Sequence, residues 1–74
     1  MERGRAVALF DGLYRLHARG LHAFLLGHTG DEQRAEDLLQ ETYLRAWRHL
    51  DDLRAIPEER RRFWLYRVAR NCLY

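Results

Sequence analysis

The sequence has little of several residue types on which small domains often depend. It has 74 residues with one cysteine, so no disulfide can form within the chain, and a reducing cytoplasm fits best. No apolar run approaches the ~18 residues that a membrane span needs, and the early run "AVALF" is too short for a signal peptide. We therefore expect one small cytoplasmic domain without a membrane partner.

Charge is unevenly distributed along the chain. There is no lysine, so all 13 basic residues are arginines, and the net charge is only +2. Acids dominate residues 31–52, whereas residues 54–74 contain six arginines and only two acids. An acidic middle and a basic C-terminal third predict two surfaces with different partners.

The hydrophobic pattern predicts an all-α fold. Apolar residues recur at three- and four-residue steps in residues 6–26, which predicts a first helix there; they are Leu9, Phe10, Leu13, Leu16, Leu21, Phe24 and Leu25. Gly27 and Gly30 suit the end of that helix, and Asp31 is a good N-cap for a second helix that runs to about His49. Residues 50–59 are the one substantial connection.

The single proline helps to place the third helix. Pro57 suits the first position of a helix that carries "RRRFWLYRVARNCLY". Its apolar stripe is Leu65, Val68, Ala69 and Cys72. We therefore expect a bundle of three helices. Because Cys72 to Tyr74 still have a helical pattern without a capping residue, we also expect the chain to be a fragment of a longer protein.

The second predicted helix has two contrasting faces. One is suited to burial and consists of Ala35, Leu38, Leu39, Thr42 and Ala46. The opposite face carries Asp37, Gln40, Glu41, Leu44 and Arg48. An apolar residue surrounded by polar groups is typical of a helix docking site, in which the leucine is desolvated and the polar groups fix orientation. The alternative is a solvated face that keeps a small helix soluble.

The third predicted helix combines arginines with an aromatic residue and an amide. Arg60, Trp64, Arg67 and Asn71 follow helical steps of 4, 3 and 4, with Arg61, Arg62 and Arg70 beside them. Arginine contacts phosphates, asparagine can contact a base edge, and an aromatic ring can stack on an unpaired base. The alternative is that Trp64 belongs to the core and the arginines only solubilise the helix.

The sequence contains no pattern that predicts catalysis or metal binding. None of its four histidines forms a His-x-x-x-His pair, and there is no C-x-x-C motif. A nucleophile motif and a glycine-rich phosphate loop are also missing. We therefore predict a protein that is not an enzyme and needs no cofactor or metal.

Two linked motifs resemble a known family. Gly30-Asp31 and the segment 35–47, "AEDLLQETYLRAW", are followed after a short interval by "WLYRVARN" at residues 64–71. Their order, spacing and residue types resemble region 2 of bacterial RNA polymerase sigma factors of the extracytoplasmic-function (ECF) group. This resemblance implies a helical domain that takes part in transcription initiation.

The resemblance also implies partners and site residues. In this family the second helix docks on the clamp helices of the β′ subunit of the RNA polymerase core, which implies docking residues Asp37, Gln40, Glu41, Leu44, Arg45 and Arg48. The next loop and helix recognise and melt the promoter minus-ten element and hold a flipped base of the non-template strand. The implied DNA-binding residues are Arg54, Arg60, Arg61, Arg62, Trp64, Arg67, Arg70 and Asn71. An anti-sigma factor is a further implied partner.

The sequence departs from the family pattern at its end. The family continues into a basic segment, a linker and a helix-turn-helix region 4 domain, and none of these lies in residues 1–74. We therefore expect this chain to dock on polymerase better than it binds a promoter. The alternative function is a small helical protein-interaction module without DNA recognition, which would lack the steep salt dependence of phosphate contacts.

Overall fold

The computed structural model of the chain describes residues 2–74 and is all-α, as predicted. Its elements are α1 (Glu2–Thr29), α2 (Glu32–Arg48), α3 (Leu50–Ala55), the 3₁₀ turn η1 (Glu58–Arg60) and α4 (Arg61–Leu73). Three long helices were expected, and residues 50–59 were expected to be a connection. That segment instead folds into α3 and η1, so the three-helix description is incomplete. Within the described residues, no helix has the length and hydrophobicity to cross a membrane.

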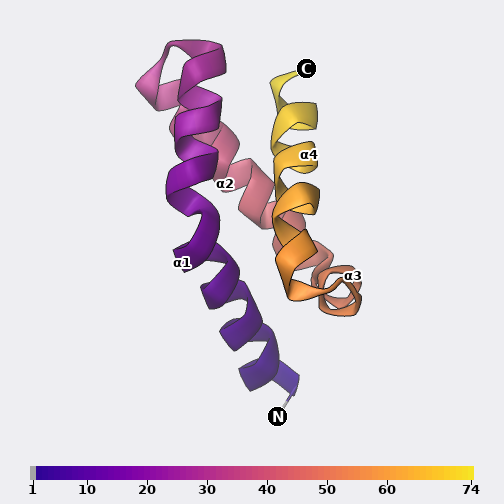
Figure 1. Ribbon diagram of the computed structural model, residues 1–74. Helices are drawn as coiled ribbons and strands as arrows, with labels where there is room; N and C mark the ends of the chain where they lie inside the picture. The colour runs from indigo at the N-terminus through magenta and orange to yellow at the C-terminus, as the bar shows by residue number, and fades with distance from the viewer. Residues whose placement is uncertain (1) are drawn as a thin grey trace.

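Helix α2 crosses behind a pair of helices that run in the same direction. In Figure 1, α1 and α4 lie side by side, and α2 passes diagonally from the end of α1 to the beginning of α3. The core lies between these three helices and α3. Its largest fully buried apolar side chains are Leu21, Leu25, Leu53 and Leu65.

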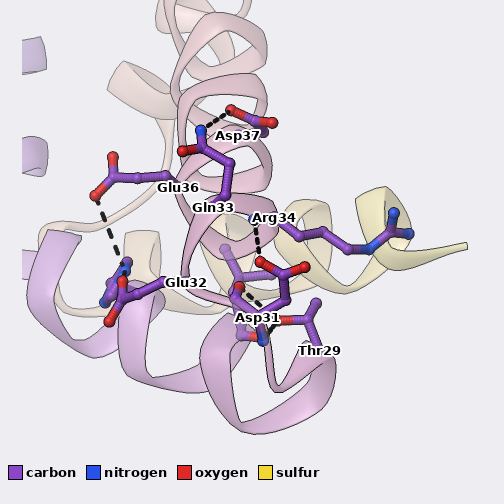
Figure 2. A network of polar contacts seen from close by, with 9 residues as sticks. Thr29, Asp31, Glu32, Gln33, Arg34, Glu36 and Asp37 are labelled. Carbon is purple, nitrogen blue, oxygen red and sulfur yellow. Dashed lines mark hydrogen bonds and ion pairs between the residues drawn. The ribbon is translucent and has the colours of Figure 1, made fainter.

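The corner between α1 and α2 has the predicted capping residues. Gly30 has a φ of 66°, which favours glycine, and its N–H donates to the Leu26 carbonyl at 2.8 Å. Asp31 is the N-cap of α2, as predicted, and its carboxylate accepts from the Arg34 N–H at 3.2 Å (Figure 2). Gly27, which was expected at the helix end, lies inside α1.

Small residues allow α2 to pack closely against its neighbours. Ala35, Thr42 and Ala46 have no exposed surface. The Thr42 hydroxyl donates to the Leu38 carbonyl at 2.8 Å, so its polar group is satisfied inside the core. Tyr43 is also buried, although the sequence did not place it there, and its hydroxyl donates to the Leu13 carbonyl of α1 at 3.0 Å.

Two other details of the predicted pattern are wrong. Leu16 was expected on the apolar stripe of α1, but it is 67% exposed because the neighbouring helices cover other sides of α1. Pro57 was expected at the first position of the third helix, but it precedes η1 with an extended ψ of 143°. Helix α3 forms because Leu50 and Leu53 become buried, with acids in its first turn and Arg54 in its last.

The close approach of α4 to α1 at Gly20 predicts different effects for two glycine substitutions. A Cβ on Gly20 would lie 2.5 Å from the Tyr66 hydroxyl oxygen, whereas one on Gly12 would have no neighbour within 4 Å. In urea unfolding, Gly12→Ala should raise the free energy of unfolding by about 0.5–1 kcal/mol through helix propensity. Gly20→Ala should stabilise the protein less than Gly12→Ala, or destabilise it, because its Cβ would meet the Tyr66 hydroxyl. In a Tyr66→Phe background, Gly20→Ala should raise the free energy of unfolding about as much as Gly12→Ala does. An equal effect of Gly20→Ala in both backgrounds would contradict the close approach of Gly20 and Tyr66.

Candidate functional site

The predicted docking residues lie together on the outer side of α2. The side chains of Asp37, Gln40, Arg45 and Arg48 are exposed, Glu41 is partly exposed, and Leu44 is 52% exposed between them. We call Asp37, Gln40, Glu41, Leu44, Arg45 and Arg48 the α2 face.

Local hydrogen bonds orient two carboxylates of the α2 face. Arg45 Nε donates to Glu41 Oε2 at 3.0 Å, which is the helical i, i+4 pair. The Gln33 side-chain amide donates to Asp37 Oδ1 at 3.2 Å (Figure 2). Each of these acceptors keeps further lone pairs open to solvent, so a partner can still bind them.

An apolar groove borders the α2 face, and sequence reasoning missed it. The groove has a volume of about 590 Å³ and lies between α1 and α2; its lining includes Val7, Phe10, Tyr14, Gln40, Leu44 and Trp47. The Trp47 ring packs edge-on against Phe10 with their centroids 5.3 Å apart, and Trp47 remains 47% exposed. Gln40 and Leu44 belong to both the α2 face and this α1–α2 groove. The groove escaped prediction because its walls come from distant parts of the sequence.

Most of the predicted DNA-binding residues lie on the exposed sides of η1 and α4. Arg60, Arg62, Arg67, Arg70 and Asn71 are exposed there, and Arg54 is exposed on α3. Trp64 is partly buried against the core, with its ring 6.0 Å from the His49 ring. Its packing therefore agrees with the core alternative, although part of the side chain stays accessible.

A small pocket opens where η1 meets α4. It has a volume of about 340 Å³ and is lined by Ile56, Arg60, Phe63, Trp64 and Arg67. We call it the η1–α4 pocket. It brings together two arginines and two aromatic rings, a combination that suits a planar group attached to a phosphate backbone.

Phe63 is a residue of this pocket that the sequence analysis did not single out. It is 61% exposed, and the Arg62 guanidinium carbon lies 4.9 Å from its ring centroid. A signal was present, because Phe63 lies outside the apolar stripe of its helix. A large aromatic residue there is exposed to solvent.

Arg61 differs from the other arginines predicted to bind DNA. Its side chain is partly buried and turns back toward α3. Its Nε lies 2.9 Å from the Leu53 carbonyl oxygen and 3.0 Å from that of Ile56. The guanidinium of Arg61 is therefore occupied by backbone carbonyls of its own chain.

His17 lies on the side of α1 that borders η1 and the beginning of α4. It is partly buried, and it shares a surface depression with Leu16, Glu58, Glu59 and Arg62. Burial lowers the pKa of His17 from its ordinary value of 6.5, and the nearby Arg62 charge lowers this pKa further. Protonation of His17 is therefore less favourable in the folded state than in the unfolded state.

Comparison with known proteins finds similarity to sigma factors, both in a family model and in individual relatives. The family model described as Sigma-70 region 2 matches residues 13–74. The chain is 46% identical over 68 residues to the ECF RNA polymerase sigma factor SigL of Mycobacterium tuberculosis, which covers 89% of this chain and 37% of that protein. It is 39% identical over 61 residues to the ECF RNA polymerase sigma factor SigM of Bacillus subtilis, which covers 82% of this chain and 36% of that protein. The chain thus spans little more than a third of the length of these relatives.

The lowered pKa of His17 predicts a pH-dependent stability. Between the lowered folded pKa and the ordinary value of 6.5, the unfolded state binds more protons, so the free energy of unfolding should fall as the pH drops through this window. His17→Gln should remove this contribution, as measured by urea unfolding from about pH 7.5 to pH 5. Arg62→Met should reduce it less, because burial is the larger cause. An unchanged pH profile in the His17→Gln variant would contradict this assignment.

Proposed function

Because this chain belongs to the sigma-70 region 2 family, as a domain of the ECF group, we propose that it acts in transcription initiation. It would dock on the RNA polymerase core through α2 and bind promoter DNA through η1 and α4. The polymerase would carry out the chemistry. The observation that carries this proposal is the α2 face, which stays exposed on the side of α2 opposite the residues that pack into the core.

The α2 face suits the β′ clamp helices that the family resemblance implies as its partner. Leu44 is half exposed at the centre of polar groups, and the apolar α1–α2 groove begins beside it. Interfaces draw most of their binding energy from such a desolvated centre, while the polar rim sets orientation. The carboxylates of Asp37 and Glu41 would complement basic residues on a partner helix.

The η1–α4 pocket suits an unpaired base of the minus-ten element on the non-template strand. Extruding a base costs a few kcal/mol, and stacking on an aromatic ring contributes about 1–3 kcal/mol per base. Phe63 offers an exposed ring for stacking, and Arg60 and Arg67 lie beside it for the backbone phosphates. Arg54, Arg62, Arg70 and Asn71 would extend this contact along the strand.

A second candidate function is a protein-interaction module without DNA recognition. The α1–α2 groove favours it, since this groove could bind a partner whatever the arginines do. Salt dependence separates the two candidates. Contacts with single-strand phosphates lower the logarithm of the binding constant by about 0.7 per contact for each tenfold rise in salt, and the interaction module predicts no such slope with DNA.

Two substitutions on the α2 face should weaken binding to a purified β′ clamp-helix fragment. We expect Glu41→Ala and Leu44→Ala each to weaken it at least tenfold, about 1.4 kcal/mol, in calorimetric titration. Matched controls lie on α1. Asp11→Ala removes a carboxylate from another exposed i, i+4 pair, and Leu16→Ala truncates another exposed leucine.

The controls decide how the docking result is interpreted. Both control variants should bind like the wild type, because Asp11 and Leu16 lie outside the α2 face. If all four variants bind equally well, the α2 face is not the docking surface. If the folded wild type does not bind the fragment, the interaction-module function is favoured.

Phe63 should contribute to binding of a single base. The probes are abasic single strands about 12 nucleotides long that carry one A, C, G or T at the centre, with the fully abasic strand as reference. The base increment is the ratio of the two affinities, measured by fluorescence anisotropy. Phe63→Ala should lower the best base increment about 5- to 150-fold or abolish it. Phe63→Leu should also lower it, and Phe63→Trp should retain it. Equal increments for the leucine and tryptophan variants would exclude stacking.

A further inference from the structure

Arg61 connects the end of α3 to the beginning of α4. It is the first residue of α4, and its Nε donates to the carbonyls of Leu53 at 2.9 Å and Ile56 at 3.0 Å. Its Nη2 adds a longer contact of 3.4 Å to the Arg54 carbonyl. One guanidinium therefore contacts three carbonyls in the last turn of α3 and just beyond it.

These contacts have a clear physical role. The last carbonyls of a helix have no partner within the helix, and α3 has only six residues to hold it in shape. The single Nε–H is shared between the carbonyls of Leu53 and Ile56. The guanidinium is planar, so Nη2 is held in a fixed position relative to Nε, from which it reaches a third carbonyl. The side chain is partly buried, where such charge-assisted bonds are less screened than in open solvent.

The same contacts reach the walls of the η1–α4 pocket. Ile56, whose carbonyl Arg61 binds, lines this pocket, and so does Arg60, the residue before Arg61. Phe63 and Trp64 follow Arg61 in the first turn of α4 and form the other wall. Arg61 thus fixes the α3 side of the pocket relative to the α4 side.

We propose that Arg61 is a positioning residue, which holds Ile56 and the end of α3 so that the η1–α4 pocket is formed before an unpaired base enters. It does not contact a phosphate itself. This inference rests on the proposed function, in which the pocket binds a base. A pocket that is already formed binds a base more tightly, because ordering the pocket does not then reduce the binding free energy.

The two possible roles of Arg61 predict different measurements. A phosphate contact contributes to the salt dependence of binding, whatever base is present, and a lysine can largely replace it. A positioning residue contributes to the base increment and leaves the salt dependence unchanged. A lysine cannot replace it, because its one ammonium nitrogen cannot occupy the positions of both Nε and Nη2, from which Arg61 donates.

The experiment compares the 74-residue wild type with Arg61→Lys and Arg61→Met, using the single-base and abasic strands described above at several salt concentrations. We expect both variants to lose most of the base increment, with the slope of affinity against salt unchanged. Arg70→Met is the matched control, since Arg70 is exposed and lies outside the pocket. It should keep the base increment and reduce the slope by about 0.7.

Each alternative result has a defined meaning. If Arg61→Met reduces the slope by about 0.7 and keeps the base increment, Arg61 is a phosphate contact and the proposal is wrong. If both Arg61 variants keep the wild-type base increment and the wild-type slope of affinity against salt, the proposal is also wrong. If the wild type itself shows no base increment, the base-binding part of the proposed function fails, and the positioning role fails with it.

Hydrogen exchange tests the positioning role without DNA. The Ile56 N–H donates to the Leu53 carbonyl at 3.1 Å, and the Arg60 N–H donates to the Pro57 carbonyl at 2.9 Å. In both Arg61 variants these two amides should exchange faster, while the amide of buried Ala46 in α2 keeps its wild-type rate. Faster exchange at all three sites would indicate general unfolding. Unchanged rates at Ile56 and Arg60 would overturn the proposal.

Discussion

The close packing of α2 is the constraint on which the rest of the structure depends. Ala35, Thr42 and Ala46 have no exposed surface, and their small side chains let α1 and α4 approach α2 from two sides. A larger side chain at any of these positions would overpack the core and force the helices apart. Since two sides of α2 are covered, only its outer side remains open, and this side carries the α2 face.

The same arrangement separates the two surfaces to which we assign function. The α2 face lies on the outer side of α2 beside the α1–α2 groove, whereas the η1–α4 pocket lies where α3 ends and α4 begins. The first surrounds an apolar centre with two carboxylates, an amide and two arginines, and the second combines arginines with aromatic rings. We propose that this division lets the domain contact a protein and a nucleic acid at the same time.

Local sequence signals predicted much of the fold correctly. Asp31 caps α2 as expected, because an N-cap depends only on the next three residues. The exposed positions of α2 also followed from helical spacing. Helix α3 was missed because six residues are too few for a periodic pattern and its stability comes from the burial of Leu50 and Leu53. The exposure of Leu16 was missed because the apolar residues along one side of a helix do not reveal how many of them the neighbouring helices cover.

The sequence by itself determined the helical class, the cap of α2, the polarity of its two faces and the concentration of arginine near the C-terminal end. These depend on periodicity and on contacts within a few residues, which the chain order specifies directly. Only the tertiary structure decided that the Arg61 guanidinium binds backbone carbonyls and that the Phe63 ring is exposed to solvent. Arg61 binds carbonyls up to eight residues away, and Phe63 stays exposed because the core is filled by Leu65 and Ala69. Both outcomes depend on how α3 and α4 pack together, and helical periodicity does not specify that packing.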